Sequence, residues 1–331
     1  MNKSLKSILA RHETVLLVVL ILEVLLFNSI GRKFLTADNI ANIVRQSVEV
    51  GLLALVMTPI ILTAGIDLSV ASLMGLSAVA FGMLWHDAGL SPWIAALGAI
   101  VVGGMGGGLN ALLITRLGLP PLIVTLGTFS LFRGLAEALT GGTKSYTNFP
   151  ESFLALGNGF ALGLPVQAWV FGLLAIGIWI LVHRTTFGRS FRAVGFAPEG
   201  AKYAGIPVQK RLALAYTMAG AVAGLAAVIF VSRVTEARAN AGVGYELAAI
   251  TAVVLGGTSI FGGVGSVHGT LLGVAAVAVL ANGLLRISSI SNGRELSGML
   301  TGALLLVALS AGAVTKIIAE RRARKGSLKP V

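Results

Sequence analysis

Asp67 is a residue whose position suggests chemistry, because it lies between two long apolar runs. It belongs to the segment of residues 64–75, and Ser69 follows two positions later. A charge in such a place is costly unless it is paired, caps a helix or faces water. Two roles therefore stay open for Asp67 and Ser69. In the first role, Asp67 or Ser69 accepts hydrogen bonds from the first N–H groups of the following helix. In the second, they line a polar path for a solute.

A basic and an acidic residue lie four positions apart in the apolar run of residues 121–140. Arg133 and Glu137 share one face of a helix at this spacing, which predicts an ion pair. Such a pair would fix helix packing or line an aqueous path. Asn110 and Asn282, in other apolar runs, predict hydrogen bonds between helices.

The sequence lacks the residues for several kinds of catalysis. It has no Cys, and no two of its His residues have the spacing of metal ligands. The Gly-x-x-x-x-Gly-Lys-Ser/Thr motif that cradles nucleotide phosphates is absent, and residues 141–145 resemble only part of it. No carboxylate pair suited to an intramembrane transferase is present. We therefore expect a chain that is not an enzyme and holds no metal or cofactor of its own.

Composition indicates which elements must position these residues. Of 331 residues, 56% are hydrophobic and 11% are charged, whereas an average soluble domain is about 25% charged. This excludes an ordinary soluble protein and favours transmembrane helices of about 20 apolar residues. We predict an all-α, polytopic membrane protein with about ten such helices in a single domain, residues 1–331. The apolar runs are 14–30, 48–63, 70–86, 92–115, 121–140, 165–183, 212–232, 247–262, 267–287 and 295–315.

Two segments are expected to lie outside the membrane on the outer side. Residues 34–46 predict a short amphipathic helix, with Thr36 or Asp38 as its N-cap. Residues 141–164 form a longer polar stretch.

The distribution of Lys and Arg predicts the orientation. If the N-terminus is cytoplasmic and ten helices cross, 16 of the 25 basic residues lie in cytoplasmic segments and 8 in outer segments. This excess matches the positive-inside rule. Both ends, residues 1–13 and the basic tail 316–331, are then cytoplasmic. The net charge of +12 is explained by topology, so we do not expect nucleic acid as a partner.

The longest polar segment on the cytoplasmic side is the loop 184–211. Within it, Pro198 favours the start of a short helix and Gly205 favours its end. Flanked by Arg192 and Lys210, such a helix is suited to dock a partner. The alternative is a solvated basic loop that simply obeys the positive-inside rule.

Small residues spaced four apart predict close contacts between helices. The pairs of this kind are Gly104–Gly108, Gly220–Gly224, Gly269–Gly273 and Gly298–Gly302. The glycine-rich residues 250–273 predict close packing or a broken helix. Dinucleotide binding is disfavoured there, because the third glycine and the flanking βαβ unit are missing.

Four motifs occur in order along nearly the whole chain. They are Gly65-Ile66-Asp67-Leu68-Ser69-Val70; Pro121 to Thr128 with Arg133-Gly134; Phe187-Gly188-Arg189 with Ala193-Val194-Gly195 and Ala204-Gly205-Ile206; and Leu255 to Thr258 with Gly262-Gly263 and Gly269-Thr270. Together they resemble the permease subunit of bacterial ABC sugar importers of the ribose, galactose, arabinose, xylose, rhamnose and autoinducer-2 type. The sequence departs from that pattern at Ala64 and Ala71, where the family has glycines, and at residues 197–200.

The resemblance implies a permease of the bacterial inner membrane that works with other subunits. Its partners would be a cytoplasmic ABC ATPase carrying ATP and Mg, a second permease, identical or related, and a periplasmic sugar-binding protein. The residues that would contact or support the ATPase are Arg192, Gly195, Pro198, Glu199, Lys202, Tyr203 and Gly205.

The resemblance also implies the solute, a monosaccharide or related small polyol, with a rhamnose-like sugar or autoinducer-2 favoured. A neutral, hydroxyl-rich solute needs hydrogen bonds along its path rather than strong charge. The candidate path residues are Asp67, Ser69, Asn110, Thr125, Thr128, Arg133 and Glu137. A self-sufficient secondary sugar transporter is the alternative. It would need inverted repeats and an ion site, for which Asp67 or the Arg133–Glu137 pair could serve.

Overall fold

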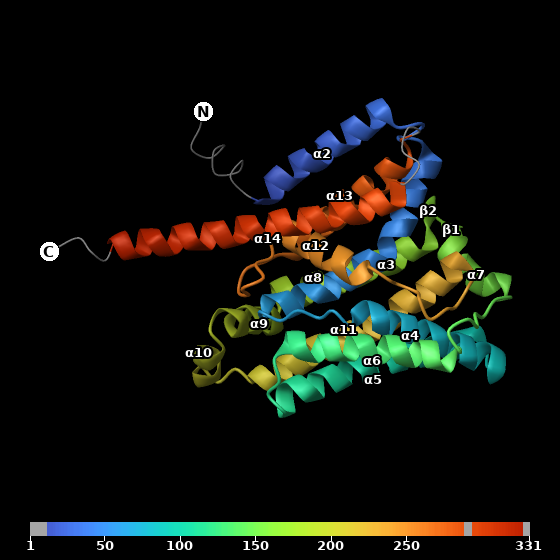
Figure 1. The fold of residues 1–331 in the computed structure, drawn as a ribbon, viewed down its shortest axis with the longest axis horizontal. Helices are drawn as coiled ribbons and strands as arrows, with labels where there is room; N and C mark the ends of the chain where they lie inside the picture. The colour runs from blue at the N-terminus through green and yellow to red at the C-terminus, as the bar shows by residue number, and fades with distance from the viewer. Residues whose placement is uncertain (1–11, 288–292, 327–331) are drawn as a thin grey trace.

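The computed structural model describes residues 12–287 and 293–326, which form helices and one short hairpin (Figure 1). Eight of the described helices are long and apolar enough to cross a membrane. They are α2 (His12–Ile30), α3 (Ala37–Leu62), α4 (Val70–Gly82) continued by the π-helix η1 (Met83–Asp87), α5 (Pro92–Arg116), α6 (Pro121–Leu139), α8 (Val166–Arg184), α11 (Val208–Val234) and α13 (Val267–Leu285). These helices confirm the prediction of an all-α, polytopic membrane protein.

Two further apolar helices occupy the remaining predicted runs. Helix α12 (Tyr245–Leu255) is shorter than predicted and ends before Gly256 and Gly257. Gly257 has a φ of +88°, and a right-handed helix cannot continue through a residue in this conformation. Helix α14 (Gly293–Gly326) contains the apolar segment Glu295–Ser310 and runs on into the basic tail.

The helices run side by side, with their connections gathered at two opposite ends (Figure 1). The start of α2 and the end of α14 lie at one end, together with α9 (Thr186–Phe196) and α10 (Pro198–Tyr203). The opposite end carries α7 (Glu151–Asn158) and the hairpin of β1 (Phe160–Ala161) and β2 (Leu164–Pro165). This arrangement agrees with two cytoplasmic ends and an even number of crossings.

The predicted short helix at residues 34–46 is not a separate element. It continues without a break into the next apolar run as α3, whose N-cap is Thr36, accepting a hydrogen bond from the Asn39 backbone N–H. The polar composition suggested a boundary, but no Gly or Pro interrupts residues 37–58 except Gly51 within a strongly apolar stretch. Of the two predicted N-caps, Thr36 and Asp38, the structure has Thr36.

The polar stretches are also more ordered than their composition indicated. Residues 141–164 contain α7 and the hairpin, and α7 buries Gly157 against the end of α11 and Phe153 against Phe81 of α4. The predicted loop 184–211 holds two helices, α9 and α10, instead of one. Helix α9 was missed because its buried face, which includes Phe191 and Val194, is hidden among basic residues.

Glycines bring α5 and α11 into backbone contact. A Cβ added at Gly103 or Gly107 would collide with the backbone of α11 around Gly220. Gly220 and Gly224 therefore pack as predicted, but on α5 the predicted pair Gly104–Gly108 is wrong by one residue. An added Cβ at Gly104 would make only an ordinary contact with Ala221 of α11, at 3.8 Å, and one at Gly108 would meet nothing within 4 Å. A shift of one position turns a helical residue by about 100°, so the period alone does not identify the packing face.

The same kind of contact joins α12 and α13. Gly269 meets the carbonyl of Gly256, and Gly273 meets that of Ala252, which confirms the predicted close packing. Gly298 has no neighbouring atom within 4 Å of an added Cβ in the described part of the chain. The packing predicted for the Gly298–Gly302 pair is therefore not found there.

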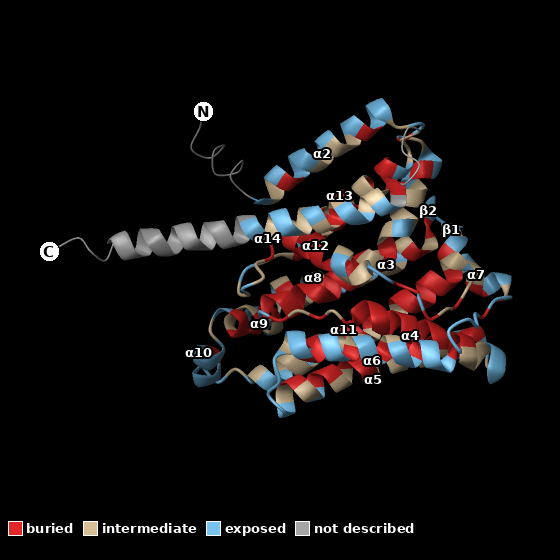
Figure 2. Cartoon of the chain, viewed as in Figure 1, coloured by how far each residue is buried: buried red, intermediate tan, exposed pale blue. Residues whose placement is uncertain are grey.

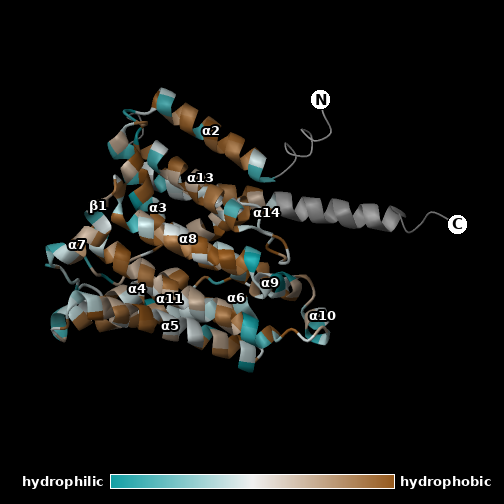
Figure 3. Ribbon diagram, turned by 180° about the vertical axis from the view of Figure 1, so that it is seen from behind, coloured by the Kyte–Doolittle hydropathy of each residue, from teal (hydrophilic) through white to brown (hydrophobic). Residues whose placement is uncertain are grey.

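Buried residues concentrate in α3, α4 and α11, whereas the outward faces of α2, α5 and α6 are exposed (Figure 2). Many of these exposed residues are large and apolar, and hydrophobic residues cover the long helices along most of their length (Figure 3). Such faces are stable in hydrocarbon and not in water. The exposed helix faces are therefore lipid-facing or meet another subunit.

Candidate functional site

The break between α3 and α4, residues 63–69, holds a buried polar cluster. Asp67 is almost wholly buried, and its Oδ1 accepts hydrogen bonds from the Ser69 backbone N–H at 2.8 Å and the Ser69 hydroxyl at 2.6 Å. Asn110 of α5 donates from Nδ2 to the Ser69 hydroxyl at 2.7 Å. The structure thus brings together three of the residues predicted for the path, from two separate segments.

The capping role predicted for this pair takes a different form. Ser69 is the N-cap residue of α4, but its side chain makes no capping hydrogen bond. Asp67 instead binds the N–H of Ser69 itself, so it fixes the turn that leads into the helix. The interhelical role of Asn110 is confirmed, as is that of Asn282, whose Oδ1 accepts from Asn39 Nδ2 at 2.9 Å.

Helix α6 is tied to the same break by one of its two threonines. Thr125 donates from Oγ1 to the carbonyl of Ile66 at 3.2 Å. Thr128 bonds to the carbonyl of Val124 within its own helix at 3.0 Å. Thr125 therefore joins the cluster, and Thr128, one turn further on, does not.

The predicted Arg133–Glu137 ion pair is not formed among the described residues. Arg133 points instead toward the irregular segment after α11, where it donates to the carbonyls of Ala239 and Ala241. Glu137 is exposed on the outer side of α6. The carbonyls of this irregular segment have no helical N–H partners, so they are available to accept hydrogen bonds from the guanidinium.

Two residues that the sequence did not single out shape these sites. A Cβ at Gly75 of α4 would lie 2.6 Å from the Ala239 carbonyl oxygen and 2.8 Å from Arg133 Nη1, so only glycine leaves room for that contact. Tyr216 of α11 is fully buried beside Gly65, and its hydroxyl has no hydrogen-bond partner in the described structure. Neither residue belongs to a recognisable spacing pattern.

At the cytoplasmic end, α9 and α10 divide the predicted coupling residues into two groups. Arg192 donates to the carbonyls of Val182, at 2.9 Å, and Gly265, at 3.3 Å. Burial lowers the pKa of the Arg192 guanidinium from its ordinary value. Gly195 packs directly on the carbonyl of Leu62. These two residues hold α9 against the membrane helices.

The other coupling candidates point outward. The exposed members of the set are Pro198, Glu199, Lys202, Tyr203 and Gly205. Tyr203 is 90% exposed, and Phe196, which the sequence analysis missed, is 85% exposed. Gly205 has a φ of +79° and ends α10, as predicted. The α9–α10 corner therefore presents two aromatic side chains to its surroundings.

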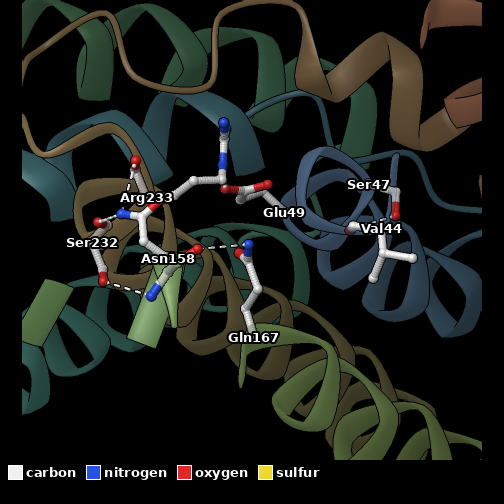
Figure 4. Close-up of polar contacts among 8 residues, drawn as sticks. Val44, Ser47, Glu49, Asn158, Gln167, Ser232 and Arg233 are labelled. Carbon is white, nitrogen blue, oxygen red and sulfur yellow. Dashed lines mark hydrogen bonds and ion pairs between the residues drawn. The ribbon is translucent and has the colours of Figure 1, made fainter. Parts of the chain in front are cut away.

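A second polar network, at the opposite end, was not predicted (Figure 4). Arg233 of α11 pairs with the fully buried Glu49 of α3 at 2.6 Å. The neighbouring Ser232 accepts from the Gly157 N–H at 2.7 Å, and Asn158 donates to the Ser232 carbonyl at 2.9 Å. This network joins α7 to the end of α11 and, through Arg233, to the middle of α3.

Residues 39–309 match the family described as "Branched-chain amino acid transport system / permease component". The chain belongs to this permease family. It is a multi-pass inner-membrane permease component of an ABC importer, which confirms the resemblance read from the four motifs.

Three relatives align with nearly the full length of the chain. The autoinducer 2 import system permease protein LsrD of Yersinia pseudotuberculosis serotype IB (strain PB1/+) is 34% identical over 328 residues, 96% of this chain and 97% of the relative. LsrD of Photorhabdus luminescens is 36% identical over 303 residues, 90% of each chain. LsrD of Yersinia pestis (strain Pestoides F) is 34% identical over 327 residues, 95% of this chain and 97% of the relative.

Proposed function

We propose that this permease imports a small, neutral, hydroxyl-rich solute, with autoinducer-2 or a rhamnose-like sugar as the favoured candidates. The observation that carries the proposal is the similarity to autoinducer 2 import permeases over 90% or more of the chain. The buried cluster at residues 63–69 supports it. Its described contacts are made by hydroxyl, amide and carboxyl groups, which suit hydrogen bonding to a polyol better than recognition of a strong charge.

The energy for transport comes from a partner ATPase that carries ATP and Mg. The chain itself lacks the phosphate-cradling motif. We assign the contact with this partner to the exposed residues of the α9–α10 corner, with Tyr203 and Glu199 at its centre. Arg192 and Gly195 serve as positioning residues that keep the corner attached to the membrane helices.

The packing of α9 offers a short physical route from the partner to the polar cluster. Gly195 lies against the Leu62 carbonyl, which also accepts a hydrogen bond from the Gly263 N–H at 2.9 Å. Leu62 is the last residue of α3, directly before the break that holds Asp67. Movement of α9 would therefore displace residues 63–69, and with them the contacts to α5 and α6. Packed contacts of this kind can carry energetic coupling between two distant sites.

The path is assigned to the region around residues 63–69. Asp67, Ser69, Asn110 and Thr125 form its polar lining or hold that lining in place. We further propose that a second permease chain completes the path and that a periplasmic binding protein delivers the solute at the end that carries α7.

Uptake by cells tests this function. A strain that expresses the chain with its neighbouring transport subunits should accumulate autoinducer-2 or rhamnose faster than the same strain without the chain. Depletion of ATP should abolish this difference. Uptake that follows the proton gradient and ignores ATP would contradict the proposal and favour a secondary transporter.

A further inference from the structure

The hairpin before α8 exposes apolar side chains where an aqueous loop would be expected. Residues 160–165 read Phe-Ala-Leu-Gly-Leu-Pro and contain no polar side chain. Leu162, at the tip, is 91% exposed and Phe160 is 58% exposed. Exposed apolar groups gathered on one short element require a partner surface more often than isolated ones do.

The hairpin is held firmly by its neighbours. Trp169 of α8 donates from its indole nitrogen to the Ala161 carbonyl at 3.0 Å. The Arg45 guanidinium lies 4.5 Å from the centre of the Phe160 ring and also donates to the Asn158 carbonyl at 3.0 Å. The exposed side chains are therefore presented by a fixed element.

The turn of the hairpin is unusual for its residue type. Leu162 has a φ of +52° and Gly163 a φ of +80°. Turns with two positive φ values favour Asn-Gly or Asp-Gly, because a leucine in the left-handed region is strained. A strained leucine at the fully exposed tip indicates that its apolar side chain has a role of its own.

The position of the hairpin identifies the surface it meets. It directly precedes α8, which has 19 residues and is therefore about 28 Å long, close to the thickness of the hydrocarbon core. The exposed face of α8 is an apolar stripe of Trp169, Leu173, Ile176 and Ile180. Tryptophan at a helix end is typical of the membrane interface. The apolar surface of the hairpin thus continues the lipid-facing stripe of α8 at the outer headgroup level.

We propose that residues 160–165 form an interfacial anchor whose Phe160, Leu162 and Leu164 side chains insert into the outer leaflet of the bilayer. The occupant is lipid, because the apolar stripe is continuous from the hairpin into the span. The anchor fixes the depth of α7 and of the start of α8 relative to the membrane. This proposed anchoring role does not depend on the identity of the transported solute.

The absence of Cys from the chain allows a direct test. Leu162→Cys is made in the otherwise unchanged permease, together with Glu151→Cys on exposed α7 as the water standard and Leu173→Cys as the lipid standard. Each variant is reconstituted in phosphatidylethanolamine–phosphatidylglycerol vesicles. Labelling by a membrane-impermeant maleimide is then measured. In parallel, a nitroxide at the same site reports its accessibility to oxygen and to a water-soluble nickel chelate.

The proposal predicts that L162C reacts about tenfold or more slowly than E151C, a ratio in line with burial of one leucine side chain. Its nitroxide should favour oxygen over the nickel chelate, as at L173C. Rapid labelling together with a nickel-accessible nitroxide would overturn the anchor. Rapid labelling that is suppressed only when a periplasmic protein is added would also overturn it, in favour of a protein docking site.

Discussion

At the scale of single residues, Asp67 acts through its neighbours. Its Oδ1 accepts from both the backbone and the hydroxyl of Ser69, and Asn110 extends the chain of hydrogen bonds into α5. The Asp67 carboxylate and Ser69 therefore fix the backbone of the break between α3 and α4 and connect it to α5. The sequence placed Asp67, Ser69 and Asn110 among the polar residues worth attention, and the structure confirms that they lie together.

Replacement of Asp67 tests whether its hydrogen bonds stabilise the break between α3 and α4. Asp67→Ala should lower the free energy of unfolding by about 1–3 kcal/mol, because it removes the acceptor for two buried donors. Asp67→Asn keeps an acceptor oxygen of the same size and should lose much less. Thermal unfolding in mild detergent, followed by size-exclusion chromatography, measures both. If D67A proves as stable as the wild type, these hydrogen bonds do not stabilise the break.

Arg133 illustrates the limit of reasoning from residue spacing. The four-residue separation from Glu137 correctly placed both side chains on one helix, but spacing within a helix says nothing of competing acceptors elsewhere. The carbonyls of Ala239 and Ala241 lie about a hundred positions later in the sequence. Only the tertiary structure shows that they reach Arg133, and that Gly75 leaves room for the contact.

At the scale of elements, the contact between α5 and α11 depends on which glycines face each other. Gly107→Leu should sharply reduce the amount of folded protein, because the side chain would enter the backbone of α11, and overpacking costs about 1–3 kcal/mol or more. Gly108→Leu is the matched control, since an added Cβ there meets nothing within 4 Å. Fluorescence-detected chromatography of both variants compares them. Equal loss in the two variants would argue against this packing.

The Glu49–Arg233 pair holds α3 to α11 where α7 docks (Figure 4). Glu49→Gln leaves a largely buried guanidinium without its counter-charge, and breaking a buried pair in this way costs about 3–5 kcal/mol. The double variant Glu49→Gln, Arg233→Gln should recover part of this loss, because no unpaired charge remains. Thermal unfolding of the single and double variants gives the coupling. Strict additivity of the two substitutions would show that the pair makes no net contribution.

The helices themselves were largely predictable, because a membrane helix requires a long apolar run and ten such runs stand out. The errors in the polar segments share one cause. Residues 34–46, 141–164 and 184–211 were judged by polar composition, but α3, α7 and α9 each bury one narrow face among polar residues. The Glu49–Arg233 network could not be predicted, since its members are 184 positions apart.

At the scale of the whole molecule, the two ends have different surfaces. One end carries the α9–α10 corner with exposed Phe196 and Tyr203, and the other carries α7 and the apolar hairpin (Figure 1). An importer permease must receive solute at one end and energy at the other. Gly195 contacts Leu62, so the corner packs directly against the residue that precedes the break at residues 63–69. In the function proposed above, this contact connects the two ends.

In the proposed function, the α9–α10 corner couples this permease to an ATPase. The most direct measurement is affinity purification of the tagged chain in gentle detergent, comparing the wild type with the Glu199→Ala, Tyr203→Ala double variant by mass spectrometry. Both side chains are exposed, so the variant should insert and fold normally. We predict that an ATPase with the phosphate-cradling motif accompanies the wild type and is lost from the variant. Equal recovery of the ATPase with both chains, or a lone permease that transports sugar without ATP, would contradict the account.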